Sequence, residues 1–534
     1  MAHSAAIDPL SGHARAPGGT RRQIVLTTPV PRDPRAGLSR RGFLEAAGVV
    51  AVGTAVAGAR APRAAGAGVV DRLLAAAGDL PVARTFVSRP DLLPPPISIV
   101  MPYTWPTRGH ILLAPFSFPT TPPSTEASGP LIIDRNGQPL WFRPLTGRTA
   151  IGLRVQSYRG EPVLTWWEGT VFGGYGGTFV LADASYARVA RVRAGNGYKA
   201  DLHEILITSR NTALITVYNE IRTDLSRIGG HVDGRLVEGV IQEIEIASGR
   251  VLFEWHSLDH IALEESSELT VTRDGNVDYF HLNSIGVDTD GHLLVSARHT
   301  SAVYKVHRRT GAVIWRLGGM RSDFTLGPGA SFGYQHDARR HSDGTLTIFD
   351  NAASLPTQQG VASRTLRLRL DMSAKKATLV RDYVGPEIRT SWAMGNAQQV
   401  GDGGVFVGWG TYPGFSEIGP DGALRFDARF TGTSVSYRAR RQRWVGRPAT
   451  RPVIATSRST NGSTHVHASW NGATEVARWQ VRAGSSARAL RPVRSVTRRG
   501  FETAAALGTS SGSVAVTALD GKGALLGVSK TVRF

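Results

Sequence analysis

The sequence predicts an all-β protein: a six-bladed β-propeller followed by a small C-terminal β-sandwich. Three observations support this fold class. From about Arg84 onward, short β-rich runs alternate with Gly, Asn and Asp turns, and long helical periodicity is absent. A pattern of strand, turn and bulky residue then recurs at a spacing that fits four-stranded units. Beyond Arg447 this pattern is replaced by a second set of β-rich runs.

The recurring pattern is an alternating strand, a turn ending in Gly, and a bulky residue four positions later. The Gly supplies the positive φ of a tight hairpin, and the bulky residue fills space between neighbouring sheets. Four clear copies are residues 132–137 with Trp141, 244–249 with Phe253, 306–311 with Trp315, and 418–422 with Phe426. The steps between the bulky residues are 112, 62 and 111. Halving the long steps predicts two degenerate copies, at residues 181–183 and 370–372.

Six such units fit into residues 84–437, the predicted propeller domain. A period of about 50–60 residues is typical of propellers, whereas an array of sandwiches would share the hairpins without needing a fixed period. We expect a linker at residues 438–448. Residues 449–534 are expected to form a basic β-sandwich similar to a fibronectin type III domain.

Charge is distributed unevenly along the 534 residues. The net charge of +20 comes from residues 1–67 (+6) and 438–534 (+14), because residues 68–437 hold 36 basic and 36 acidic residues. Basic ends attract acidic polymers or surfaces more often than they read bases, so no specific nucleic-acid partner is expected. The basic C-terminal domain is instead expected to contact an acidic polymer or surface. The lack of cysteine excludes disulfides, thiolate nucleophiles, iron–sulfur clusters and cysteine-ligated zinc.

The N-terminus is interpreted as an export signal. Ser39-Arg40-Arg41-Gly42-Phe43-Leu44 fits the twin-arginine pattern, and a weakly apolar run of small residues follows over 46–59. That run is too short for a membrane span, which needs about 20 residues. Residues 1–67 are therefore predicted to be a flexible signal region. The mature protein is predicted to be soluble and either extracellular or bound to the cell envelope.

A second repeat concerns polar side chains. A His or Asn stands about 8–11 residues ahead of the strand that follows each of four turns. These residues are His203, His281, His336 and Asn396. Equivalent positions on the innermost strands of a propeller converge on its axis, so we expect the three imidazoles to meet. Five other histidines lack this spacing and are interpreted as surface or turn residues: His256, His260, His299, His307 and His341.

Imidazoles with an Arg and an Asn, and no carboxylate at the same repeat position, favour binding of an oxyanion. Arg298 ends the strand after His281, and its planar donor fork suits sulfate or phosphate oxygens. An imidazole can act as nucleophile or general base near neutral pH. Three His can also hold zinc with one open position. Their spacing decides neither for nor against a metal.

Several segments between residue 84 and about 430 resemble the arylsulfotransferase family of exported six-bladed propellers. The similar segments are 87–92 with 94–96, 163–169, 195–197, 201–204, 280–284, 296–298, 315–319 and 335–337. This resemblance implies PAPS-independent transfer of a sulfuryl group from a phenolic sulfate ester to a phenol, through a sulfated histidine and without a cofactor. No metal is expected in the site.

The resemblance also implies roles for individual residues. His336 would be the nucleophile, while His203, His281 and Arg298 would surround the sulfuryl oxygens and the leaving phenolate. Asn283 would help to bind the substrate. The Trp166–Trp167 pair is assigned to a pocket for the phenol, although Trp in a propeller strand more often belongs to the core between blades.

Two other functions remain open at this stage. One is a noncatalytic exported propeller that binds an anionic glycan or cell-wall polymer. The other is a metal-dependent hydrolase or lyase that uses the histidines as ligands. A quinoprotein dehydrogenase is disfavoured, because the sequence has no repeated tryptophan-docking signature.

Overall fold

The computed structural model describes most of the chain beyond the predicted signal region. The described residues are 85–103, 108–118, 127–171, 176–267, 276–352, 361–460, 462–507 and 512–534. The twin-arginine motif and the rest of residues 1–67 lie outside them. Within the described ranges, no helix is long and apolar enough to cross a membrane.

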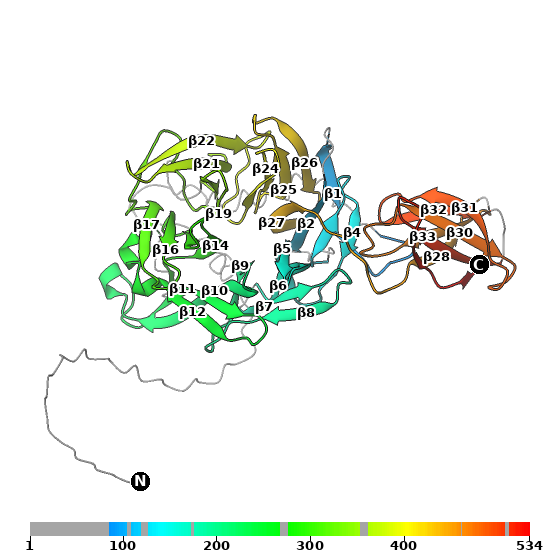
Figure 1. Cartoon of the computed structure of the whole chain (residues 1–534), viewed down its shortest axis with the longest axis horizontal. Helices are drawn as coiled ribbons and strands as arrows, with labels where there is room; N and C mark the ends of the chain where they lie inside the picture. The colour runs from blue at the N-terminus through cyan, green and yellow to red at the C-terminus, as the bar shows by residue number, and fades with distance from the viewer. Residues whose placement is uncertain are drawn as a thin grey trace, which may run out of the picture.

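Antiparallel sheets are arranged in a ring, with a separate pair of sheets beside it at the C-terminal end (Figure 1). This is the all-β propeller and sandwich that the sequence predicts. In the described part of the chain, strand pairing divides the ring into six four-stranded groups, two of which join through the single pair Gly177 and Ala200 to make one larger sheet.

In the first three groups, the strands are named from the innermost outward. Group one contains β27 (Ser434–Gln442), β2 (His110–Ser117), β3 (Leu131–Ile133) and β4 (Pro139–Phe142). Group two contains β5 (Thr149–Tyr158), β6 (Glu161–Gly169), β7 (Gly177–Ala182) and β8 (Arg188–Val192). Group three contains β9 (Ala200–Ile207), β10 (Thr212–Thr223), β11 (Gly234–Glu245) and β12 (Val251–His256), with β13 (Asn276–Asp278) parallel to β11.

The remaining groups complete the ring. Group four contains β14 (Leu282–Val287), β15 (Leu293–Ala297), β16 (Ala302–Val306) and β17 (Val313–Gly318). Group five contains β19 (His336–Arg340), β20 (Thr345–Asp350), β21 (Arg364–Asp371) and β22 (Lys376–Val384), with β18 (Thr325–Leu326) beside β22. Group six contains β23 (Asn396–Gln399), β24 (Val405–Gly408), β25 (Gly414–Ile418) and β26 (Leu424–Phe430). Three short 3-10 turns are η1 (Ser226–Ile228), η2 (Ser257–Asp259) and η3 (Leu263–Glu265).

Strands from both ends of the propeller sequence close the ring. β27 pairs with β2 and becomes the innermost strand of group one. β1 (Ile97–Met101) pairs with β26 and extends the outer edge of group six. Each closure joins the start of the propeller sequence to its end, so opening the ring requires breaking a full strand ladder.

The predicted hairpin repeat falls at the turn between the third and fourth strand of each group. Gly137, Gly249, Gly311 and Gly422 stand in these turns with φ between 73° and 86°. Both degenerate copies lie at the same place, between β7 and β8 and between β21 and β22. There Tyr186 (φ 66°) and Lys375 (φ 48°) take the left-handed conformation in place of Gly, which weakens the sequence signal.

The C-terminal sandwich consists of two facing sheets. One contains β28 (Val453–Arg458), β29 (Thr464–Ser469) and β32 (Glu502–Leu507). The other contains β31 (Arg491–Thr497), β30 (Arg478–Gly484), β33 (Ser513–Leu519), β34 (Leu525–Val528) and β35 (Val532–Arg533). Trp479, Val466 and Val516 are buried in the core between them.

The predicted linker at residues 438–448 needs a correction. Arg438 to Gln442 are the second half of β27, and the Arg438 side chain is only 3% exposed. Arginine-rich sequence suggested an exposed connection, but these guanidiniums enter the ring and pair with buried carboxylates. The connection to the sandwich therefore begins only after Gln442.

The predicted phenol pocket at Trp166 and Trp167 is also wrong, because both side chains are buried to 1% exposure or less. They alternate across β6 and enter two different cores. Trp166 packs edge-on against Trp141 and donates from Nε1 to Glu168 Oε1 at 2.8 Å. Trp167 donates to the Ala200 carbonyl at 3.1 Å, on the other side of the strand.

Replacing Trp166 with Ala should therefore destabilise the ring rather than impair substrate binding. A buried Trp→Ala change costs about 3–5 kcal/mol, because it removes apolar contacts and leaves a cavity. The free energy of unfolding from denaturant titration should fall by that amount, with a smaller loss for Trp166→Phe. A Trp166→Ala protein with unchanged stability and a raised KM for an aryl substrate would return this residue to the substrate pocket.

Candidate active site

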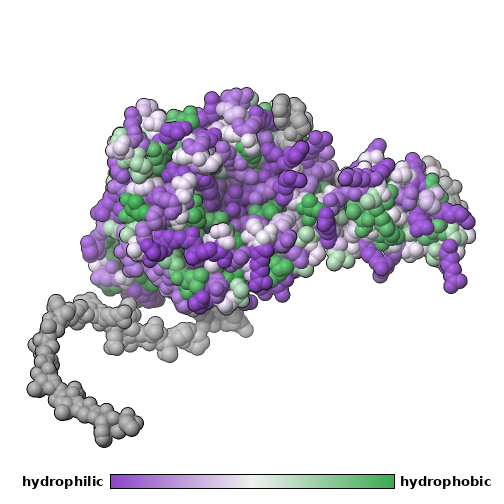
Figure 2. Space-filling view, viewed as in Figure 1, coloured by the Kyte–Doolittle hydropathy of each residue, from purple (hydrophilic) through white to green (hydrophobic). Residues whose placement is uncertain are grey.

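Three innermost strands bring the predicted histidines together. His203 lies in β9, His281 immediately precedes β14, and His336 is the first residue of β19. The ring centroids of His203 and His281 are 5.3 Å apart. Tyr437 of β27 links His203 to His336. Its ring centroid lies 5.5 Å from that of His203 and 6.1 Å from that of His336. The face seen in Figure 2 is hollowed at the centre of the ring, and hydrophilic residues line the hollow.

Carboxylates fix the tautomers of His203 and His281. His203 Nδ1 lies 2.6 Å from Asp201 Oδ2, and His281 Nδ1 lies 2.5 Å from Asp278 Oδ2. An ionised carboxylate only accepts hydrogen bonds, so each Nδ1 carries a proton. In the neutral rings the Nε2 lone pair is then available. These aspartates stand two and three residues before their histidines, and sequence analysis did not single them out.

Neutral acceptors hold His336. Its Nδ1 lies 2.8 Å from Asn351 Oδ1 and 3.1 Å from the Tyr334 carbonyl. Asn351 Nδ2 donates to the carbonyls of Ser391 and Met394, which orients the amide oxygen toward the imidazole. His336 Nδ1 therefore donates, and Nε2 accepts a hydrogen bond from the Met394 N–H at 3.2 Å.

Burial keeps several of these imidazoles uncharged. Loss of solvation lowers the pKa of His336 well below its ordinary value, and the positive charge of Arg298 lowers it further. Burial likewise lowers the pKa of His281 well below the ordinary range, with a further contribution from His203. A neutral imidazole retains the lone pair that a nucleophile or base requires.

Arg298 is buried beside the histidines, as the sequence predicts. Its Nη2 donates to the Trp392 carbonyl at 3.0 Å, and its guanidinium carbon lies 4.0 Å from the Tyr334 ring centroid. Its Nη1 donates to His299 Nε2 at 2.7 Å. A guanidinium can only donate hydrogen bonds, so His299 Nε2 must accept this one with its lone pair.

The interpretation of His299 as a surface or turn residue is right about the turn, which follows β15, but wrong about the surface. It is 4% exposed, and its ring centroid lies 4.5 Å from that of His281. Burial lowers its pKa to about 3. His299 lacks the repeat spacing because it follows the end of β15 rather than beginning an innermost strand. Its place next to Arg298 in the sequence was the signal that could have identified it.

Asn283 is fully buried in β14, two residues after His281. Its Nδ2 donates to the Gln335 carbonyl at 2.7 Å, which ties β14 to the residue before His336. The main-chain carbonyl of Asn283 accepts a hydrogen bond from Arg438 Nη2 at 3.1 Å. In the structure, these contacts hold neighbouring innermost strands in register.

Backbone strain gathers around the same residues. Several non-glycine residues with φ between 48° and 65° are at the site or adjoin it: His281, Ser301, Tyr334, Asp337, Ala352 and Met394. Left-handed conformations in residues with a Cβ cost free energy and persist only where surrounding contacts impose them. Contacts within the propeller hold these residues in the left-handed conformation, which costs free energy locally and fixes the directions of the imidazoles.

An aromatic side adjoins the polar residues. Trp392, whose carbonyl accepts from Arg298, is half-buried, and its ring centroid lies 6.1 Å from that of Phe118. Phe118 in turn contacts Phe116 edge-on at 5.7 Å. Unlike the Trp166–Trp167 pair, Trp392 and Phe118 retain exposed surface. Sequence analysis missed them because neither follows a repeat.

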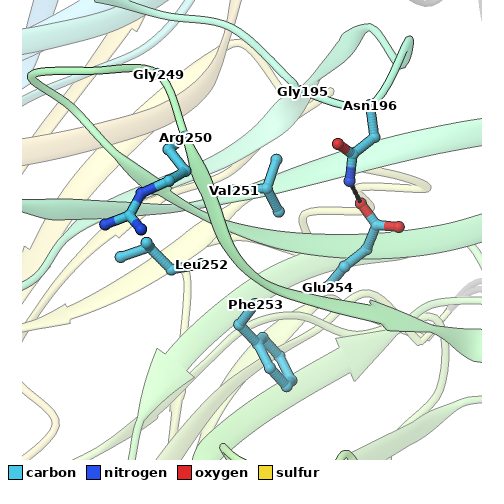
Figure 3. Close-up of a pocket in the computed structure, with 8 residues that line it drawn as sticks. All are labelled: Gly195, Asn196, Gly249, Arg250, Val251, Leu252, Phe253 and Glu254. Carbon is cyan, nitrogen blue, oxygen red and sulfur yellow. Dashed lines mark hydrogen bonds between the residues drawn. The ribbon is translucent and has the colours of Figure 1, made fainter.

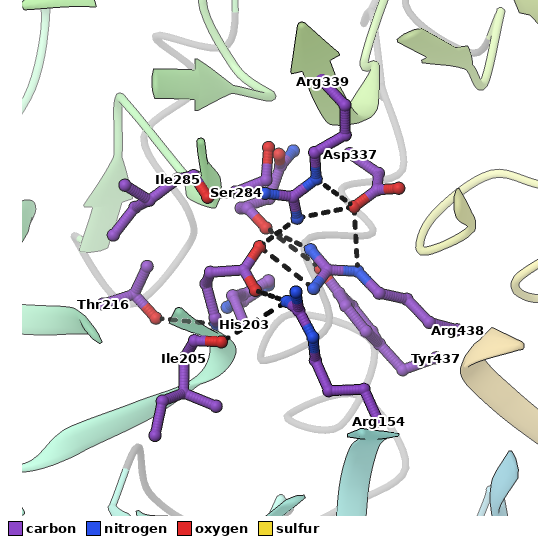
Figure 4. A network of polar contacts seen from close by, with 12 residues as sticks. Arg154, His203, Ile205, Thr216, Ser284, Ile285, Asp337, Arg339, Tyr437 and Arg438 are labelled. Atoms are coloured by element: carbon purple, nitrogen blue, oxygen red, sulfur yellow. Dashed lines mark hydrogen bonds and ion pairs between the residues drawn. The ribbon is translucent and has the colours of Figure 1, made fainter. Parts of the chain in front are cut away.

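A charged network lies one residue further along the same innermost strands (Figure 4). Glu204 of β9 pairs with Arg154 of β5, Arg339 of β19 and Arg438 of β27. Asp337 of β19 pairs with Arg339 at 2.7 Å, and Arg438 and Arg440 also lie within ion-pair distance of it. Burial raises the pKa of Glu204, but the three arginines outweigh it and hold that pKa below the ordinary value.

Among the described residues, the group that could hold a metal ion differs from the predicted histidine trio. It consists of Asp278, His281 and His299, whose ligand atoms lie within 4.8 Å of one another. Both imidazoles donate from Nδ1 to Asp278, one to the carboxylate and one to the main-chain carbonyl. A metal bound at these Nδ1 atoms would have to displace both protons.

A second hollow of about 490 Å³ lies at the outer part of group three (Figure 3). Its lining includes Asn196, Arg250 and Glu254, and Asn196 Nδ2 donates to Glu254 Oε2 at 2.8 Å. His256 contacts this lining, with Nε2 3.0 Å from Glu254, and its Nδ1 lies 3.1 Å from Glu238. The hydrogen bond to Glu238 is the main cause that raises the pKa of His256 to about 9.

His299 and His256 should give stability an opposite dependence on pH. The folded pKa of His299, about 3, is below the ordinary 6.5, so its contribution is lost as pH falls below 6.5. The folded pKa of His256, about 9, is raised, so its contribution is lost as pH rises toward and through 9. Thermal midpoints should fall on both sides, and His256→Gln should remove only the alkaline fall. NMR titration of His299 near pH 6.5 would contradict this assignment.

A comparison with protein-family models places this chain in a family. The arylsulfotransferase (ASST) family model matches residues 154–431, more than half of the chain, including the three histidines and Arg298. A search of curated protein sequences finds no match.

Solved structures are similar only at a distance. A protein of unknown function from Bacteroides caccae is 13% identical, covering 60% of this chain and 93% of its own, with a TM-score of 0.37. An inactive virginiamycin B lyase from Staphylococcus aureus, with quinupristin, is 10% identical over 62% and 87%, with a TM-score of 0.33. The Cps50 (Swd1) β-propeller domain of Myceliophteria thermophila is 12% identical over 57% and 92%, with a TM-score of 0.30. These similarities carry no inference about function. From the match of the family model, the chain belongs to the arylsulfotransferase family.

Proposed function

We propose that the protein is a PAPS-independent sulfotransferase, which moves a sulfuryl group from a phenolic sulfate ester to a phenol through a sulfated histidine. The observation that carries this proposal is a buried set of neutral imidazoles around Arg298, at the axis of a ring that belongs to the arylsulfotransferase family. No cofactor is required, because the donor ester supplies the activated group.

His336 is the nucleophile in this proposal. Its Nε2 attacks the sulfur, an S–N bond forms, and the S–O ester bond breaks with its electron pair passing to the phenolate. The sulfated ring is cationic, and its Nδ1 proton remains bonded to Asn351 and the Tyr334 carbonyl. The 3.2 Å hydrogen bond from the Met394 N–H to Nε2 has to be given up before attack.

His203 and His281 act in proton transfer. Each has a carboxylate on Nδ1, which stabilises a proton arriving at Nε2. In the second half-reaction one of them takes the phenol proton as the acceptor oxygen attacks sulfur and the S–N bond returns its pair to His336. The same imidazolium then protonates the leaving phenolate of the next donor. Protons therefore balance over each cycle.

Arg298 binds the sulfuryl oxygens. Negative charge spreads over these oxygens during transfer, and a guanidinium held by Trp392 and Tyr334 is already oriented to receive it. The aryl groups of donor and acceptor stack against Trp392 and Phe118, two half-buried aromatic residues of which Trp392 binds this guanidinium through its main-chain carbonyl. Asn283 supports the site from below through its contact with the residue before His336.

The His336→Ala variant should lose transfer from a chromogenic aryl sulfate to an added phenol. Removing a nucleophile should lower kcat by several orders of magnitude, because covalent transfer has no other route. His307→Ala, in the turn after β16, is the matched control and should keep full activity. Acceptor-dependent release of phenolate by the His336→Ala protein at the wild-type rate would refute the assigned role.

Trp392→Ala should raise KM for aryl sulfates more than it lowers kcat. Loss of ring stacking weakens binding by about 0.5–1.5 kcal/mol, which corresponds to a roughly two- to tenfold change. Trp392→Phe should restore most of the affinity, since a planar ring remains. The measurement is steady-state kinetics with donors of increasing ring size. Equal KM values for wild type and Trp392→Ala would exclude this residue from the aryl pocket.

The cluster of Asp278, His281 and His299 keeps a metal-dependent hydrolase as a second candidate. Elemental analysis of the purified protein decides between them, because a stoichiometric metal required for activity supports only the hydrolase. A binder without catalysis would show neither a metal requirement nor phenolate release.

We also propose that the chain is exported by the twin-arginine route and that its C-terminal sandwich contacts an acidic polymer. Support comes from the Ser39-Arg40-Arg41 motif and from the exposed arginines of β31, Arg491 and Arg494. Sedimentation of the isolated protein with an acidic cell-wall polymer, at low and high salt, tests the second part.

A further inference from the structure

Positive charge is in excess within the charged network of Glu204 and Asp337 on the innermost strands. Within the described residues, four guanidiniums meet two carboxylates in the network on the innermost strands. These groups are Arg154, Arg339, Arg438 and Arg440, with Glu204 and Asp337. Two positive charges therefore have no carboxylate of their own. A buried charge is costly unless it is paired and hydrogen-bonded.

Arg154 and Arg440 are the members of the network with the fewest ion pairs. Arg339 and Arg438 each contact both carboxylates. Arg154 reaches only Glu204, at 3.1 Å, and Arg440 reaches only Asp337, at 3.3 Å. Of the described groups, none offers either guanidinium a second carboxylate. The Arg154 Nε is buried and has no hydrogen-bond partner in this part of the chain.

These two arginines lie on neighbouring innermost strands. Arg154 is on β5 and Arg440 on β27, and the two strands pack side by side. Burial lowers the pKa of Arg154 to about 9, and the charge of Arg440 is the next cause. Burial also lowers the pKa of Arg440 to about 10, although Asp337 opposes this. The positive charges of Arg438 and Arg339 lower the pKa of Arg440 further, so both guanidiniums stand among like charges in a poorly solvated place.

We propose that Arg154 and Arg440 together bind a small inorganic anion, such as sulfate or chloride, on the axis of the ring. The anion supplies the missing negative charge and accepts hydrogen bonds from both guanidinium groups. This site is separate from the one that holds the transferred sulfuryl group, whose residues are the histidines and Arg298. It depends on the charge count and not on the proposed transfer reaction.

The test measures anion binding by the full-length protein. The protein is dialysed into a buffer of low ionic strength whose only anion is bulky and organic, then titrated with sodium sulfate or sodium chloride by calorimetry. Wild type should bind at least one of these anions saturably, and its thermal midpoint should rise. Arg440→Gln and Arg154→Gln should each weaken that binding at least tenfold.

Charge relief provides a second readout. Without added anion, Arg440→Gln should melt at a higher temperature than wild type, because it removes repulsion. With saturating anion the order should reverse. Arg443→Gln carries the same charge change at an exposed position just after β27, and should behave as wild type.

Arg298→Gln separates this site from the proposed sulfuryl site. Sulfate or chloride binding that persists in Arg298→Gln and disappears in Arg440→Gln supports the axial site. The proposal is overturned if both Arg154→Gln and Arg440→Gln keep wild-type affinity. It is equally overturned if Arg298→Gln alone removes all anion binding.

Discussion

Burial of charge where the innermost strands converge is the constraint on which this structure depends. Charged groups shielded from water must find partners, and here the partners come from strands far apart in the sequence. Arg438, in the last strand of the ring, reaches Glu204 in β9 and Asp337 in β19. Arg438 therefore ties β27 to two other innermost strands, while the β27–β2 ladder ties β27 to the start of the propeller sequence. One strand thus contributes both to ring closure and to charge pairing.

The same poor solvation determines the chemistry next to the network. It disfavours imidazolium, so His281, His299 and His336 remain neutral where exposed histidines would titrate. Hydrogen bonds then select the tautomer, with carboxylates behind His203 and His281 and neutral acceptors behind His336. Only His203 and His281 therefore have a carboxylate beside Nδ1, while burial disfavours protonation of His281 and His336 alike.

Local signals predicted the repeat because hairpin geometry is a local property. A turn that needs positive φ selects Gly, and a strand edge between sheets selects a bulky residue, so the spacing of Gly137 and Trp141 returns at Gly311 and Trp315. The histidine positions were predictable for the same reason, since each lies in an innermost strand or directly before one. Residues outside a repeat gave no such signal. Trp392, Asn351 and His299 come to the site from loops or strand ends.

The sequence by itself determined the all-β class, the hairpin period, the basic ends of the chain and the histidines that share a repeat position. Only the tertiary structure decided which side of a strand a residue faces and what lies opposite it. The sequence left Trp166 open between a substrate contact and the core between blades, and its burial assigns it to the core. Arg438 was expected in a linker, but its strand closes the ring. The physical reason is that propensity and periodicity act over a few residues, whereas burial and charge pairing depend on strands more than a hundred residues apart.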